Sequence, residues 1–176
     1  MSQIGVSLLV VSLPGKVDLY FAMLIPWTIA FGVWALALTA VHSKYEDLHF
    51  RTVQGFARNM PIVGLSLILA QFSIAGFPVL AGFPTLLTLW NDLASQSVWA
   101  AGLSLLGSLG LFGSALRTLA VAVMGNEQQV WKISESWIMI FFLGLATTGL
   151  LIIGLFPAWF YVLISQVPGV FQQLVQ

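Results

Sequence analysis

Cysteine and charged side chains are what this chain has least of. Among its 176 residues there is no cysteine, and only 7 % are Asp, Glu, Lys or Arg. The missing thiols exclude disulfides, thiolate metal sites, iron–sulfur ligation and a cysteine nucleophile. A soluble domain carries about 25 % charged residues, so this composition cannot supply a water-exposed surface. The six basic and six acidic residues cancel, which removes the electrostatic case for binding nucleic acid.

Long apolar runs take the place of the missing charge. Hydrophobic residues make up 59 % of the chain, and its mean hydropathy is +0.98. Because a spanning helix needs about 20 apolar residues, the runs predict an all-α, polytopic membrane helix bundle of about six passes. The whole chain, 1–176, is then a single transmembrane domain. Its expected parts are a short first helix at 2–13, spans at about 19–41, 61–75, 79–91, 98–124 and 136–156, and an interfacial tail at 158–176.

Arg117 is the only ionisable residue inside the predicted spans, because every carboxylate lies in a loop or at a span end. A proton path needs several titratable groups at membrane depth, and the chain does not supply them by itself. Arg117 lies roughly 10 Å from the end of its helix, beside the small residues Gly107, Gly110, Ser114 and Thr118. We expect the guanidinium to face protein. There it is either a structural arginine bonded to a carbonyl or lipid phosphate, or a charge beside a buried ion path.

Motifs for catalysis and for metal or cofactor binding are missing. The sequence has no phosphate-binding loop, no serine nucleophile elbow and no paired acids. His42 and His49 have no third ligand at metal spacing. We therefore predict no catalytic residue, no metal and no cofactor.

An interruption within the apolar region spanning residues 61–90 is the strongest local signal. Proline removes an amide donor and glycine relaxes the backbone, so carbonyls near such residues lose their helical partners. Broken helices at membrane depth are tolerated only inside protein or around water, and transporters place ion sites at them. The alternative is a hairpin turn at the membrane surface. The candidate break residues are Gly76, Phe77, Pro78, Gly82, Phe83 and Pro84.

At these residues the chain resembles the antiporter-like membrane subunits of respiratory complex I, most closely chain N (chain 2 in mitochondria). Residues 76–83 follow the family pattern G-[IF]-P-P-x-A-G-F-x-x-K with one proline replaced. Residues 53–61 are similar to its G-[LF]-x-R-x-x-P stretch, and 154–157 to its closing G-L-F-P. Arg117 matches an arginine near the end of a long helix, and residues 2–5 resemble a short S-x-[IM]-G piece. The resemblance covers nearly the whole chain, but only the C-terminal part of the family fold.

Two departures from the family pattern bear on function. The position that carries a titratable residue in the family, usually lysine, is Leu86 here, and leucine cannot exchange a proton. The helices that precede this region in the family, with their central lysine and Glu–Lys pair, have no counterpart in this sequence; if the subunit is split, another chain would carry them. The resemblance therefore implies a truncated or split subunit with a packing role and at most an indirect part in ion translocation.

Three functional interpretations follow. In the first, the chain belongs to the membrane arm of a complex I type respiratory or photosynthetic assembly, in a bacterial inner membrane or an equivalent energy-transducing membrane. It contacts other membrane subunits and lipid there, as a non-catalytic subunit of an oxidoreductase complex. In the second, it is a family-derived structural accessory subunit of another energy-converting membrane complex, with no ion path. The third, a small homo-oligomeric transporter, is disfavoured because the spans offer no coupling-ion carboxylate.

Overall fold

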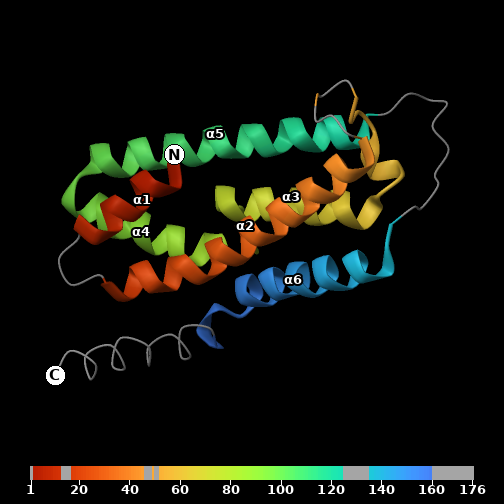
Figure 1. Cartoon of the computed structure of the whole chain (residues 1–176). Helices are drawn as coiled ribbons and strands as arrows, with labels where there is room; N and C mark the ends of the chain where they lie inside the picture. Colours follow the sequence, from red (N-terminus) through yellow and green to blue (C-terminus); the bar gives the residue numbers. More distant parts are fainter. Residues whose placement is uncertain (1, 13–16, 46–48, 50–51, 125–134, 160–176) are drawn as a thin grey trace.

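Six α-helices and one short 3-10 helix make up the described part of the chain. The computed structural model describes residues 2–12, 17–45, 49, 52–124 and 135–159 (Figure 1). Most of the expected interfacial tail therefore lies outside the described residues. No strand occurs in the described ranges, and the predicted all-α fold class is confirmed. The helices are α1 (Ser2–Ser12), α2 (Val17–Tyr45), η1 (Phe56–Arg58), α3 (Pro61–Ala75), α4 (Gly82–Gln96), α5 (Val98–Val123) and α6 (Trp137–Leu155).

Local sequence signals set several helix ends. Pro61 occupies the first turn of α3, where its missing N–H costs no hydrogen bond. The side chains of Ser97 and Ser136 cap α5 and α6, each accepting a hydrogen bond from the backbone N–H three residues further on. Such caps satisfy amides that a helix start leaves unpaired.

Three described helices are long and apolar enough to cross a membrane. They are Leu19–Tyr45 within α2, Val98–Val123 and Trp137–Leu155. The apolar α3 has only 15 residues, about 22 Å at 1.5 Å per residue, which is shorter than a bilayer core of about 30 Å. The chain is an integral membrane protein, and α3 by itself is too short to cross a bilayer core.

Helices α3 and α4 follow one another along the bundle, antiparallel to α5 (Figure 1). The start of α3 lies at the C-terminal end of α5, because the Gly55 N–H beside it donates to the Val121 carbonyl at 2.8 Å. The end of α4 is separated from the start of α5 by Ser97 alone. The 26 residues of α5, about 39 Å long, therefore run back along both shorter helices.

Two apolar clusters lie one after the other along this discontinuous pair. The first surrounds α3 and takes residues from the second half of α2 and from α6; Ala30, Val33, Ala37, Val63, Leu67, Leu143 and Leu150 belong to it. The second surrounds α4 and joins α1 to the first half of α2; it contains Val10, Leu19, Met23, Trp27, Leu86, Leu89, Leu93 and Ala101. The interruption between α3 and α4 thus separates two cores, and both α2 and α5 contribute residues to each of them.

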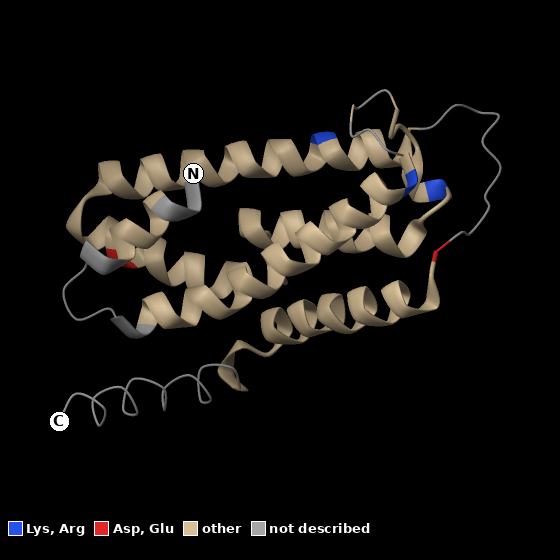
Figure 2. Cartoon of the chain, viewed as in Figure 1, with Lys and Arg blue, Asp and Glu red and all other residues tan. Residues whose placement is uncertain are grey.

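Charged residues avoid the middle of the bundle (Figure 2). Lys44 in the last turn of α2, Arg58 in η1 and Glu135 ahead of α6 lie at one end, and Asp92 lies in α4 toward the other. Arg117 on α5 is the one described charge placed along the body of a spanning helix. This distribution matches a membrane core between two polar ends.

Candidate functional site

The first half of the site is the C-terminal end of α3. Gly76 takes the left-handed conformation with φ 79°, which glycine adopts without a Cβ penalty. Its N–H donates to the Ser73 carbonyl at 3.2 Å, and the Phe77 N–H donates to the Phe72 carbonyl at 2.9 Å. The rings of Phe72 and Phe77 pack at 5.3 Å, so the turn has both hydrogen bonds and the hydrophobic contact of a Schellman motif. Two carbonyls that the proline-rich pattern was expected to leave without partners are therefore satisfied by the chain itself.

A second turn leads from Phe77 into α4. The Leu80 N–H donates to the Phe77 carbonyl at 3.2 Å, with Pro78 and Val79 between them. Val79 has φ 79° and is the only non-glycine residue with positive φ among the described residues. Proline followed by a positive φ is the geometry of a type II turn, which favours glycine at its third position. A β-branched side chain there is strained.

Helix α4 begins in direct contact with the end of α3. A Cβ built on Gly82, the first residue of α4, would collide with the Ser73 carbonyl oxygen. A Cβ on Gly76 would collide with the Leu86 side chain. The two helix ends therefore meet at a distance that only glycine permits.

Helix α6 closes the site from a third side. It buries Leu143, Thr147 and Leu150 along one face, and Gly154 continues that face one turn later. A Cβ on Gly154 would collide with the Val79 carbonyl oxygen and with the backbone of Leu80. The glycine of the closing G-L-F-P motif thus lets α6 pack directly on the turn, a role that the sequence pattern did not reveal.

An aromatic cluster covers the outer side of the break. The Phe112 ring on α5 stacks on Phe77 at 5.7 Å with an interplanar angle of 5°, and lies 5.4 Å from Phe72. These ring contacts join α3, which carries Phe72, to the turn, which carries Phe77, and to α5, which carries Phe112. No pattern in the sequence marks Phe72 or Phe112, because their contact depends on how α5 returns along α3.

Leu86 is the residue that the resemblance predicts to stand at the family's titratable position. Its side chain is 2 % exposed and belongs to the apolar cluster around α4. It lies on Gly76 and also borders a cleft of about 340 Å³ between α1 and α5. Among the described residues, no group of three His, Cys, Asp or Glu side chains could hold a metal ion. This site can pack helices but has no group of its own at Leu86 to bind or release a proton.

Arg117 lies outside the break, about five residues further along α5 than Phe112, or about 8 Å. Its side chain is exposed on the surface of the chain. That the guanidinium faces protein, as expected from the small residues beside it, therefore stays a prediction. The structure does not bring Arg117 together with Leu86 or the break glycines.

Fold and site together define an all-α integral membrane protein with a discontinuous helix. The profile of the family described as "NADH:quinone oxidoreductase/Mrp antiporter, TM" matches residues 1–116, and the chain belongs to this family. The resemblance to the antiporter-like subunits of complex I is thereby confirmed. The matched segment contains α1 to α4 and the break, whereas Arg117 and Gly154 lie beyond it.

Two curated relatives are similar at low identity. F(420)H(2) dehydrogenase subunit N of Methanosarcina mazei is 29 % identical over 127 residues, which cover 71 % of this chain and 26 % of the relative. NADH-quinone oxidoreductase subunit N of Pelagibacter ubique is 26 % identical over 130 residues, which cover 70 % of this chain and 27 % of the relative. The chain therefore spans about a quarter of the length of these relatives. No solved structure matches it.

Proposed function

We propose that this chain is a truncated or split antiporter-like subunit in the membrane arm of a complex I type respiratory or photosynthetic assembly. Its role is to pack against other membrane subunits and lipid in a bacterial inner membrane or an equivalent energy-transducing membrane. Its part in ion translocation is at most indirect. Family membership and the names of the two relatives, both subunits N of dehydrogenase or oxidoreductase complexes, support this assignment.

The buried Leu86 side chain is the observation that carries the proposal. An ion path through a broken helix uses the freed carbonyls and a nearby titratable group. Here the Schellman turn pairs the Phe72 and Ser73 carbonyls, and Leu86 fills the space beside Gly76. The role of the break is then to let α3 and α4 pack closely against each other inside protein. Its residues are Gly76, Phe77, Pro78, Gly82, Phe83 and Pro84.

Arg117 contributes indirectly in this proposal. An arginine side chain is a permanent cation in proteins and does not serve as a proton relay. A fixed positive charge on an exposed face of α5 attracts carboxylates or phosphates on whatever covers that face. It can also bias the protonation of groups on a neighbouring subunit.

Proton flux through the chain tests the absence of an ion path. The purified chain is reconstituted alone into vesicles, and an imposed pH gradient is followed with an entrapped pH dye. We expect the gradient to decay at the rate of protein-free vesicles. Faster decay that Arg117→Ala abolishes would contradict the proposal, because it would show a path within this chain.

Assembly is tested in the native membrane. Gentle detergent extraction followed by a native gel should place the chain in a large particle whose other chains, identified by mass spectrometry, include further antiporter-family membrane subunits. A particle whose partners belong to a different energy-converting complex would favour the alternative, a structural accessory subunit with no ion path. A monodisperse single-chain particle with full helicity would contradict both.

A further inference from the structure

A groove of about 280 Å³ lies between α4 and α5, next to the break, and we call it the α4–α5 groove. Phe77 in the turn and Leu105 and Leu109 on α5 border it with exposed side chains, so the groove is open to the surroundings of the chain. Except for Ser108, its side-chain lining is aliphatic and aromatic, and it includes Phe77, Phe83, Trp90, Leu105, Leu109 and Phe112.

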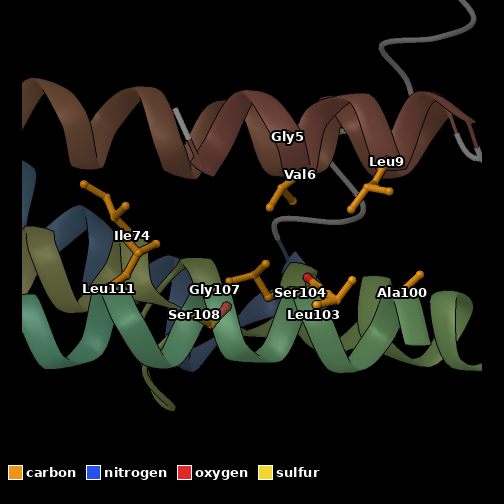
Figure 3. A pocket seen from close by; sticks show the side chains of 11 residues that line it. Gly5, Val6, Leu9, Ile74, Ala100, Leu103, Ser104, Gly107, Ser108 and Leu111 are labelled. Carbon is orange, nitrogen blue, oxygen red and sulfur yellow. The ribbon is translucent and has the colours of Figure 1, made fainter. Parts of the chain in front are cut away.

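The other side of α5 is covered by this chain. The cleft of about 340 Å³ there is bordered by Gly5, Val6 and Leu9 of α1, and Figure 3 shows Val6 and Leu9 pointing toward the α5 residues across it. No helix has that role at the α4–α5 groove, because the residues that line it come from α3, the turn, α4 and α5 alone. Its occupant therefore lies outside the described residues.

The groove has the depth of one bilayer leaflet. Helix α5 is long and apolar enough to cross a membrane, and its 26 residues are about 39 Å long. Leu105 and Phe112 lie about 10 Å and 21 Å along it from Val98. The groove therefore occupies the half of α5 that adjoins the end of α4. Half of a bilayer core is about 15 Å thick, which is the depth that one lipid tail fills.

Size and lining favour a single lipid tail over a helix as the occupant. A helix is about 10 Å across, so it would fill this volume in less than one turn of its length. A lipid tail is only one methylene group wide, so the same volume extends along it through the groove. The aliphatic and aromatic side chains supply the dispersion contacts that such a tail makes.

Trp90 borders the groove near the end of α4 and offers a hydrogen bond. Its Nε1 atom has no hydrogen-bond partner among the described residues, although a buried indole N–H usually finds an acceptor. Tryptophan is enriched where a membrane core meets its polar surface, which is the depth of the ester carbonyls of glycerolipids. Such a carbonyl is an acceptor, whereas a hydrocarbon side chain is not.

From these observations we infer that one tail of a glycerolipid occupies the α4–α5 groove, with its methyl end at the break and its ester end near Trp90. The tail fills the space between α4 and α5 and covers Phe77 and Phe112 beside the turn. The inference goes beyond the proposed function, because the lipid contacts this chain alone and requires no partner subunit.

Lipid retention tests the inference. The full chain is purified in detergent and washed free of bulk lipid, and native mass spectrometry counts the glycerolipids that stay bound; we expect a single one. Leu105→Trp enlarges a side chain that lines the groove and should lower the retained fraction about tenfold, by analogy with overpacked cores. Leu106→Trp, at the next position and also exposed, does not line the groove and is the matched control. It should leave the retained fraction unchanged.

Fluorescence quenching locates the lipid without any substitution at position 105. Because the chain has no cysteine, one fluorophore can be attached at Leu109→Cys beside the groove, or at Leu145→Cys on the exposed surface of α6 as the control. Each labelled chain is reconstituted with glycerolipids that carry bromine near the methyl end, then extracted and washed as before. The retained lipid should quench the label at position 109 several-fold more than the label at position 145.

The outcomes separate this lipid site from the assembly. Equal lipid retention by the two tryptophan variants, or equal quenching of the two labels, would overturn the inference. A chain that keeps its full helicity after losing every lipid would also overturn it, and so would a lipid-free dimer. A chain that retains the lipid but enters no larger particle on a native gel would contradict the proposed function and leave the lipid site standing.

Discussion

Replacing Gly82 with alanine should force α3 and α4 apart at the break. The added Cβ would collide with the carbonyl oxygen of Ser73 and would lie 3.2 Å from its carbonyl carbon. Both atoms belong to the backbone of the last turn of α3, so no side chain can move aside to make room. The collision can be relieved only by shifting one helix relative to the other.

The expected cost follows from what such a shift disturbs. Overpacking a well-packed interior costs about 1–3 kcal/mol, which lowers the folding equilibrium constant by a factor of about 5 to 150. The matched control is Gly149→Ala in α6, where a Cβ would meet nothing within 4 Å. Because alanine is the better helix former by up to about 1 kcal/mol, the control should be neutral or stabilising.

Unfolding of the purified chain in detergent, titrated with SDS and followed by far-UV ellipticity, measures this difference. Gly82→Ala should unfold at a clearly lower SDS fraction than Gly149→Ala. Equal midpoints for the two variants would refute the close contact between α3 and α4. The larger Gly82→Leu variant should in addition fail to enter the assembled particle on a native gel.

Substitutions at three further positions test neighbouring features. Val79→Gly should raise the free energy of unfolding by about 1 kcal/mol, because glycine has no Cβ to be strained at a positive φ. The Val79 side chain is 53 % exposed, so little packing is lost with it. Lower stability of this variant in the same titration would contradict the strain. Leu86→Lys should cost about 3 kcal/mol by placing an ammonium in an apolar setting, whereas Leu86→Met should cost less than about 1.5 kcal/mol; a lysine variant as stable as the original would show that water reaches the break. Glu135→Gln should weaken the bond from the Val63 N–H to Glu135 Oε1, now 2.9 Å, by about 1 kcal/mol, because a charged acceptor is stronger than a neutral one. Hydrogen exchange at the Val63 amide should then rise about fivefold, and unchanged exchange would argue against this hydrogen bond.

Local chemistry explains which parts of the fold could be predicted from the sequence. The helix-starting proline Pro61 and the left-handed glycine Gly76 are local signals, and α3 begins after Met60 and ends before Gly76. The start of α4 is less local. It lies at Gly82 rather than at Val79, because the hydrogen bond from the Leu80 N–H to the Phe77 carbonyl holds Val79 in a turn.

Contacts between distant segments could not be predicted in the same way. A side chain larger than hydrogen at position 154 would collide with the turn between α3 and α4, and this depends on where α6 ends relative to that turn. The stacking of Phe77 on Phe112 depends on how α5 runs back along α3. The orientation of Arg117 depends on helix rotation, which hydropathy alone does not determine in a helix that is apolar on nearly every side. The sequence indicated that a charge lies on α5, but not that it is exposed on the surface of this chain.

The meeting of α3 and α4 at Ser73 and Gly82 has an electrostatic consequence. A helix carries about half a negative charge at its C-terminus and half a positive charge at its N-terminus. Here the negative end of α3 lies against the positive end of α4, so the two macrodipoles are aligned head to tail and their facing partial charges largely cancel. Where a broken helix leaves its ends apart, each end projects a field that attracts an ion. In this chain the ends neutralise each other, and a mobile cation or anion passing along the bundle would meet little attraction at the interruption.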